Sequence, residues 1–115
     1  MFENAAKKML KRHRNECLNA LDNLDTYKER LDGGATPLQL VRLLAFARNE
    51  KEDAYAIDQT GDRPTNTEIR LYVFPDEATS ELHVVLIGDK QSQQRDVNEV
   101  HDFIRDIKKT REKKS

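Results

Sequence analysis

The chain has 115 residues, which is enough for one domain with a small hydrophobic core. Charged residues make up 36% and hydrophobic residues 37% of the sequence, a composition typical of a folded chain with a heavily charged surface. A formal net charge of −1 excludes a protein that coats nucleic acid through bulk charge, so any role with nucleic acid requires local clusters of cations.

Two clusters of cations are present, KKMLKRHR at residues 7–14 and the tail at residues 105–114. We expect the first on the outer face of a helix and the second at a helix end, where cations interact favourably with the helix dipole. Each cluster alone is also typical of an ordinary solvated helix surface.

Cys17 is the only cysteine in the sequence, which excludes an internal disulfide framework and a cysteine-rich metal site. No signal peptide is recognisable, and no apolar run approaches the roughly 18 residues of a membrane span. We therefore expect a cytoplasmic protein that does not enter a membrane.

The first third of the chain, residues 1–32, has the 3.6-residue apolar period of an amphipathic helix. The residues that follow this period are Phe2, Ala5, Ala6, Met9, Leu10, Cys17, Leu21, Leu24, Tyr27 and Leu31. Periodicity does not separate one helix of about 30 residues from a helical hairpin bent near residues 19–25. Gly33-Gly34 ends the segment.

A second helix begins at Thr36-Pro37-Leu38-Gln39, where threonine can cap, proline suits the first helical position and Gln39 stands at the capping-box position. We expect this helix to end before the charged residues 49–53. Residues 54–59 form a short strand, and residues 60–64 read as a loop because of their turn residues.

Two further strands and a helix complete the chain. Residues 68–74 alternate as a strand, residues 75–80 turn the chain, and residues 82–87 return as an antiparallel partner. A last helix begins near Ser92, with Val97, Val100, Ile104 and Ile107 on one face. The fold class is α+β: N-terminal helices, a small antiparallel sheet of about three strands and a C-terminal helix in a single domain, 1–115.

Strand alternation provides the main functional hypothesis. If Ile69, Leu71 and Val73 face the helices, Arg70 and Tyr72 stand on the opposite, open face of the sheet. Arginine matches phosphate oxygens with its planar fork of donors, and tyrosine can stack on a base.

Lys90 and Arg95 follow the neighbouring strand, so we expect them on the same face as Arg70 and Tyr72. Together these side chains would form a binding site for RNA phosphates. The alternative is a polar pairing of Arg70 with Glu68 or Glu81, with Tyr72 half-buried.

The three histidines are candidates for proton transfer because their unperturbed pKa lies nearest neutrality. His13 lies in a basic helix face, His101 lies beside the apolar stripe of the last helix, and His83 begins a strand. No histidine has a specific metal-ligand spacing, and no glycine-rich phosphate loop is present. We therefore expect neither a metal nor a cofactor.

The order of elements resembles the RelE/ParE superfamily of bacterial toxins, in particular its HigB-like, phage-derived branch. The resemblance is carried by EIRLYVF (residues 68–74), the strand at residues 82–87, Lys90, and SQQRDV (residues 92–97) leading into the last helix. It covers a toxin-like core at residues 36–107, after a helical segment at 1–32 and before a basic tail at 108–115.

The resemblance implies the toxin of a toxin–antitoxin pair that cuts mRNA on the ribosome without a metal. It implies that Arg70 and Lys90 stabilise the transition-state charge, Arg95 anchors a phosphate and Tyr72 orients a nucleotide. His83 is the candidate general base. On this basis Arg70→Ala is expected to be close to silent in fold and severe in activity.

The partners implied by the resemblance are a cognate antitoxin, mRNA and the ribosome, and a homodimer is compatible with the sequence. Two other readings stay open. One is a non-enzymatic interaction module that binds a partner through the apolar stripe of the N-terminal amphipathic helix. The alternative is that this stripe packs against the domain's own sheet. The other reading is a toxin of the same superfamily that poisons gyrase.

Overall fold

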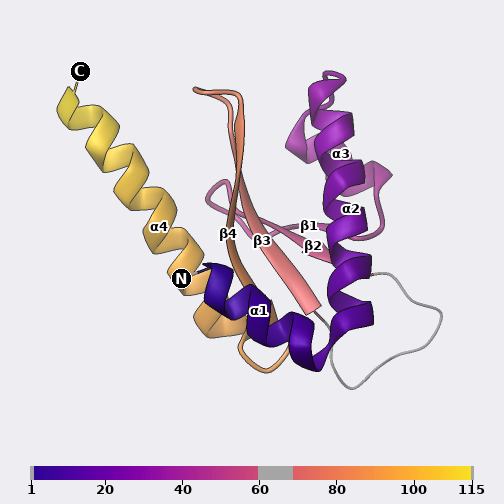
Figure 1. The fold of residues 1–115 in the computed structure, drawn as a ribbon. Coiled ribbons are helices and arrows are strands. Elements are labelled where there is room, and N and C mark those ends of the chain that lie inside the picture. The colour runs from indigo at the N-terminus through magenta and orange to yellow at the C-terminus, as the bar shows by residue number, and fades with distance from the viewer. Residues whose placement is uncertain (1, 60–68, 115) are drawn as a thin grey trace.

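The computed structural model of the chain describes residues 2–59 and 69–114, and within this part it confirms the α+β class. Four antiparallel strands pair in the order β1-β2-β3-β4: β1 (Ala47–Asn49), β2 (Tyr55–Asp58), β3 (Ile69–Asp76) and β4 (Glu81–Asp89). Helices α1 (Phe2–Arg12) and α2 (Arg14–Asp32) lie on one face, and α4 (Gln93–Lys114) lies on the other (Figure 1). The short helix α3 (Pro37–Leu43) packs beside β1 and α2.

The sheet has one strand more than the sequence predicts, because β1 is only three residues long. Such a strand has no recognisable alternation of its own. It exists because Ala47, Arg48 and Asn49 pair with Ile57, Ala56 and Tyr55 of β2.

The N-terminal segment is two helices, and the break between them lies at His13. It is therefore neither one continuous helix nor a hairpin bent near residues 19–25, the two alternatives that the apolar period left open. The chain breaks at His13, whose φ of −136° and ψ of 54° are not helical. Residues 11–16 contain no apolar side chain, so nothing ties this stretch to the core. Helix α1 packs against β4, whereas α2 packs against β2 and β3. The break at His13 allows the two helices to run in different directions along the sheet.

The start of α3 is as the sequence predicts. Thr36 Oγ1 accepts from the backbone N–H of Gln39 (3.2 Å), and the Gln39 side chain accepts from the N–H of Thr36 (2.9 Å). These two hydrogen bonds satisfy N–H groups that have no partner within the helix. Pro37 occupies the first turn, where its missing N–H costs nothing.

The two faces of the sheet carry separate hydrophobic clusters. On the face toward α1 and α2, here called the α2 face, Ile69, Leu71 and Val73 pack with residues of the helices. On the opposite face, the α4 face, Tyr72 and Phe74 pack with buried residues of α4. The alternation predicted for β3 is therefore confirmed, but its second face is covered by a helix.

No helix within residues 2–59 and 69–114 has the length and apolar character needed to cross a membrane. Glu68 and the expected loop at residues 60–64 lie outside the described residues.

Candidate functional site

Arg70 and Tyr72 lie beneath α4 and not on an open face. Arg70 is 3% exposed and Tyr72 is fully buried. Burial raises the pKa of the Tyr72 phenol to about 12, and the neighbouring Arg70 guanidinium acts in the opposite direction. The expectation of an open face is wrong because β-strand alternation says which side a residue faces, and not whether another element covers that side.

The alternative hypothesis paired Arg70 with Glu68 or Glu81. Glu68 lies outside the described residues, and Glu81 pairs with Asp76 at the other end of β4. Among the described residues, the acidic partner of Arg70 is Asp58. Arg70 Nε lies 3.3 Å from Asp58 Oδ1, on the residue directly opposite in β2. Arg48 Nε lies 2.6 Å from the other oxygen of Asp58. Asp58 therefore joins cations from β1 and β3.

A second polar group lies where β4 runs into α4. Ser92 Oγ donates a hydrogen bond to Asp96 Oδ2 (2.5 Å), and the N–H of Ser92 donates to Asp89 Oδ1 (3.1 Å). Asp96 is 4% exposed. Burial raises the pKa of its carboxyl group, against the lowering effect of the Ser92 hydrogen bond.

Gly88 allows this arrangement. A Cβ atom at this position would lie only 1.9 Å from Asp96 Oδ2, so any other residue would force the carboxylate away. Gly88 also pairs with Arg70 across the β3–β4 ladder. We call Arg70, Tyr72, Gly88, Ser92 and Asp96 together the Arg70 cluster.

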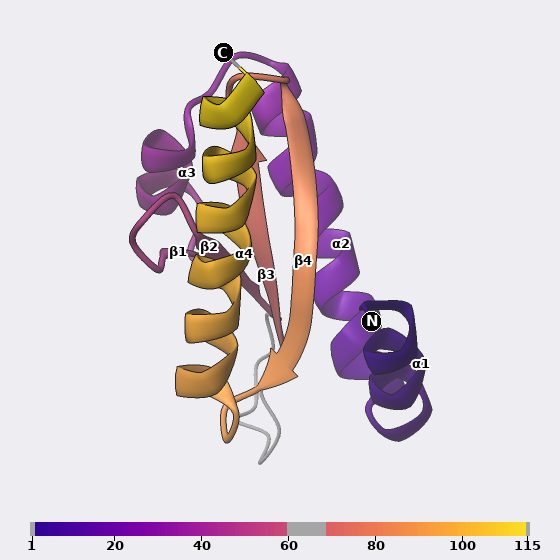
Figure 2. The ribbon, with the colours of Figure 1, turned by 90° about the vertical axis from the view of Figure 1, so that its left-hand side faces the viewer.

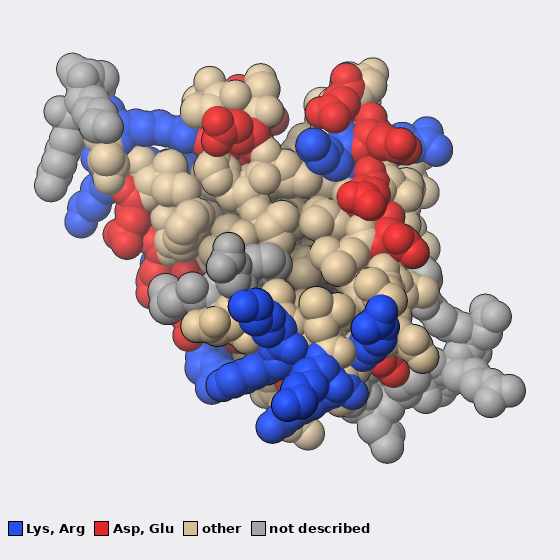
Figure 3. All heavy atoms as spheres, in the orientation of Figure 1, with Lys and Arg blue, Asp and Glu red and all other residues tan. Residues whose placement is uncertain are grey.

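Lys90 and Arg95 are exposed beside this cluster, on the β4–α4 turn and the first turn of α4. At the same end of the molecule α1 runs across the sheet (Figure 1). Figure 3 shows Lys and Arg side chains gathered over this helix. We call the exposed cations at this end the cationic end; its members are Lys7, Lys8, Lys11, Arg12, Arg14, Lys90 and Arg95.

The structure does not bring His83 to this cluster. His83 pairs with Phe74 near the other end of β4, about five residues or roughly 17 Å along the strand from Gly88. Its Nε2 lies 3.4 Å from Asp76 Oδ2, and its ring stacks on Phe74 with centroids 5.6 Å apart. Arg111 of α4 forms a bidentate pair with the same buried Asp76.

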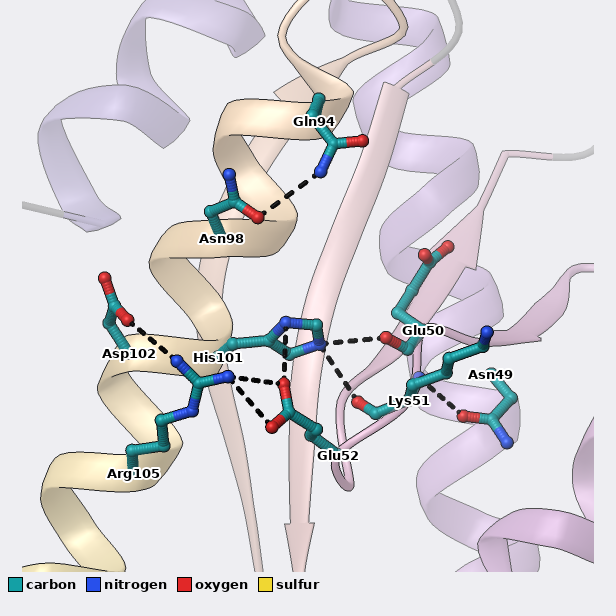
Figure 4. A network of polar contacts seen from close by, with 9 residues as sticks. All are labelled: Asn49, Glu50, Lys51, Glu52, Gln94, Asn98, His101, Asp102 and Arg105. Atoms are coloured by element: carbon teal, nitrogen blue, oxygen red, sulfur yellow. Dashed lines mark hydrogen bonds and ion pairs between the residues drawn. The ribbon is translucent and has the colours of Figure 1, made fainter.

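Polar contacts fasten the middle of α4 to the β1–β2 turn (Figure 4). His101 Nε2 donates to the carbonyl oxygens of Glu50 (2.9 Å) and Lys51 (3.1 Å), while its Nδ1 lies 3.1 Å from Glu52 Oε2. All three partners are oxygen acceptors, so each ring nitrogen of His101 faces an acceptor. Arg105 binds both oxygens of Glu52 at 2.9 Å, and α4 is thereby held across the Arg70 cluster.

The sequence proposed Arg70, Tyr72, Lys90 and Arg95 as site residues but not the packing of Gly88 against the buried Asp96. A glycine inside an apolar strand is a signal of close approach by another group. Ser92 and Asp96 are four residues apart at a helix start, which is the spacing of neighbours on one helix face. Together these signals point to the junction of β4 and α4, although not to the burial of the carboxylate.

Within residues 2–59 and 69–114, no group of three or more His, Cys, Asp or Glu side chains could hold a metal ion. No protein family model matches the chain, and neither does any curated protein or any solved structure.

Proposed function

We propose that the chain is the toxin of a bacterial toxin–antitoxin pair and that it binds and cleaves mRNA without a metal ion. The observation that supports this best is that the exposed cations Lys90 and Arg95 lie beside the Arg70 cluster at the junction of β4 and α4, in a chain whose net charge is only −1. RNA phosphates suit such a surface because each cation that neutralises a phosphate releases a bound counterion.

The exposed cations Lys90 and Arg95 make the first phosphate contacts in this proposal. Arg70 and Tyr72 are buried, so they contact RNA only after the first turns of α4 move away from the sheet. Arg70 then stabilises the charge on the phosphorus centre, and Tyr72 stacks on a base.

The proposed reaction is an attack of a ribose 2′-oxygen on the adjacent phosphorus, which breaks the bond to the 5′-oxygen of the next nucleotide. The 2′-hydroxyl gives up its proton and the leaving 5′-oxygen gains one, so the products are a 2′,3′-cyclic phosphate and a 5′-hydroxyl. We assign no general base, because His83 lies at the other end of β4.

The interaction-module reading has less support. Most of the apolar stripe of the N-terminal helices is used by the domain's own core. Cys17 and Tyr27 belong to the buried cluster of the α2 face, and further stripe residues pack against it: Ala6, Met9, Leu10, Leu21, Leu24 and Leu31. Leu18, at 42% exposure, is the large hydrophobic residue of α2 that remains exposed.

Inducible expression in bacteria tests the proposed function. We expect growth arrest with cleaved mRNA in cells that express the chain, and reversal by a cognate antitoxin. The double variant Lys90→Ala/Arg95→Ala should lower the cleavage rate by at least about 10²-fold, because stabilising cations are lost from the phosphate site. Arg42→Ala is the matched control, since Arg42 is an exposed cation on α3, away from this site.

Cleavage by the purified protein completes the test. The RNA product should carry a 2′,3′-cyclic phosphate by mass spectrometry, and EDTA should leave the rate unchanged. Healthy growth with intact mRNA would refute the nuclease, and arrest accompanied by DNA-damage signalling would favour gyrase as the target.

A further inference from the structure

Among residues 2–59 and 69–114, strand β4 has a free edge. It is the last strand in the order β1-β2-β3-β4, so within this part of the chain only β3 pairs with it. In Figure 2 its ribbon runs in full view between α4 and α2, and neither helix crosses its middle. The other edge strand, β1, has three residues, whereas β4 has nine. The side chains at residues 82–86 are half-buried, while every residue of β3 is buried.

This edge lacks most of the features that protect edge strands from pairing. Residues 82–88 contain no proline and no Lys, Arg, Asp or Glu side chain. This stretch does contain a bulge, which is one protective feature: Val73 pairs with Val84 and Tyr72 pairs with Leu86, which leaves Val85 as the extra residue. Helix α1 also packs against β4, on the α2 face. A long apolar edge of this kind offers unpaired backbone groups to another strand.

We propose that β4 pairs with β4 of a second copy of this chain, antiparallel about a two-fold axis, to give one continuous eight-stranded sheet. In such pairing, residues that lie opposite each other must project from the same face of the sheet. This requirement selects the register, because the bulge reverses the alternation partway along β4.

The side chains of β4 divide between the two faces. Val84 and Ile87 pack in the cluster of the α2 face, while Val85 and Leu86 pack in the cluster of the α4 face. If Val85 lies opposite the partner's Leu86, Val84 lies opposite the partner's Ile87 and both pairs match in face. If the two strands are shifted by one residue, Val84 lies opposite the partner's Leu86. These two side chains project from different faces of the sheet, so this register does not match.

The same register pairs opposite charges at both ends of the contact. Counting outward from Val85, Glu81 falls opposite the partner's Lys90, and the two-fold axis repeats this pair. Glu81 and Lys90 are both exposed, and among the described residues the only ion pair of either is a long contact of 3.8 Å between Glu81 Oε2 and His83 Nε2. Antiparallel pairing also brings the cationic end of each copy toward the β3–β4 turn of the other, where Glu77 and Glu81 lie. Face matching and charge thus favour one arrangement.

Charge reversal tests this dimer. Sedimentation velocity over a concentration series should show a monomer–dimer equilibrium for the natural chain. Glu81→Lys and Lys90→Glu each set like charges opposite each other twice, and each should weaken the dimer by about tenfold. The combined variant E81K/K90E restores opposite charges and should return the dissociation constant to within about threefold of the natural value.

Glu29→Lys serves as the control, because it makes the same charge change on an exposed position of α2, away from β4. It should leave the dimer unchanged. A natural chain that stays monomeric over the whole series would overturn the proposal. So would a combined variant that dimerises no better than its two single parents.

Discussion

At the scale of single residues, the Arg70 cluster depends on fits that tolerate little change. Arg70 is buried and paired with Asp58, so its removal would leave a cavity and a half-buried carboxylate with one partner fewer. Breaking such a pair typically costs about 3–5 kcal/mol. Arg70→Ala is therefore not the fold-silent change that the sequence suggests, and exposed Lys90 and Arg95 are better probes of function.

Gly88→Ala should destabilise the protein by about 1–3 kcal/mol, because the added methyl group overlaps the Asp96 carboxylate. Thermal or urea unfolding measures the loss. Combining the change with Asp96→Ala should recover part of it, since the overlapping atoms are gone, and a double-mutant cycle reports this coupling. Strict additivity of the two changes would show that the contact is not the cause.

At the scale of secondary-structure elements, the sequence predicts well what local pattern controls. The capping box at Thr36 and Gln39 and the alternation of β3 are as expected, because both depend on near neighbours. The break at His13 and the three-residue β1 depend on distant contacts, which no local period records. The covering of Arg70 by α4 belongs to the second kind, which is why the candidate site was predicted on an exposed face.

Acid should loosen the attachment of α4 through Asp76 and Glu52. The bidentate Arg111 pair holds the pKa of Asp76 well below its usual range, and Arg105 lowers the pKa of Glu52. A carboxyl group whose pKa is depressed by folding stabilises the folded state when the pH is above its unfolded-state pKa. This stabilisation is lost as the pH falls through its folded-state pKa. The free energy of unfolding should therefore decline below about pH 5.

Asp76→Asn tests this dependence on acid. At neutral pH the variant should lose about 1.5–3 kcal/mol, the usual range for a hydrogen bond to a charged group. Its free energy of unfolding should also fall less steeply with acid than that of the natural chain, because one depressed carboxyl group is gone. Parallel pH curves for the two proteins, measured by urea unfolding, would rule out Asp76 as a source of the acid sensitivity.

At the scale of the whole molecule, the near-zero net charge conceals a separation of charge. Cations gather over α1, while acidic side chains of α2 lie higher on the same face (Figure 3). The exposed acidic residues in the C-terminal half of α2 are Asp25, Glu29 and Asp32. A composition count cannot reveal this arrangement, because it depends on the direction that each helix takes after the break at His13. The cationic end also adjoins the free edge of β4 at Lys90.

RNA binding and dimerisation should compete, because both proposals use Lys90. The proposed dimer pairs it with the partner's Glu81, and the proposed RNA complex pairs it with a phosphate. Saturating single-stranded RNA should therefore shift the sedimentation profile toward monomers. Conversely, a protein concentration high enough to form the dimer should weaken RNA binding, and the two effects should have the same coupling free energy. The variant Lys90→Ala should reduce this coupling, whereas Arg42→Ala should preserve it. Equal affinity of RNA for monomer and dimer would refute the competition, while each proposal would still be judged by its own test.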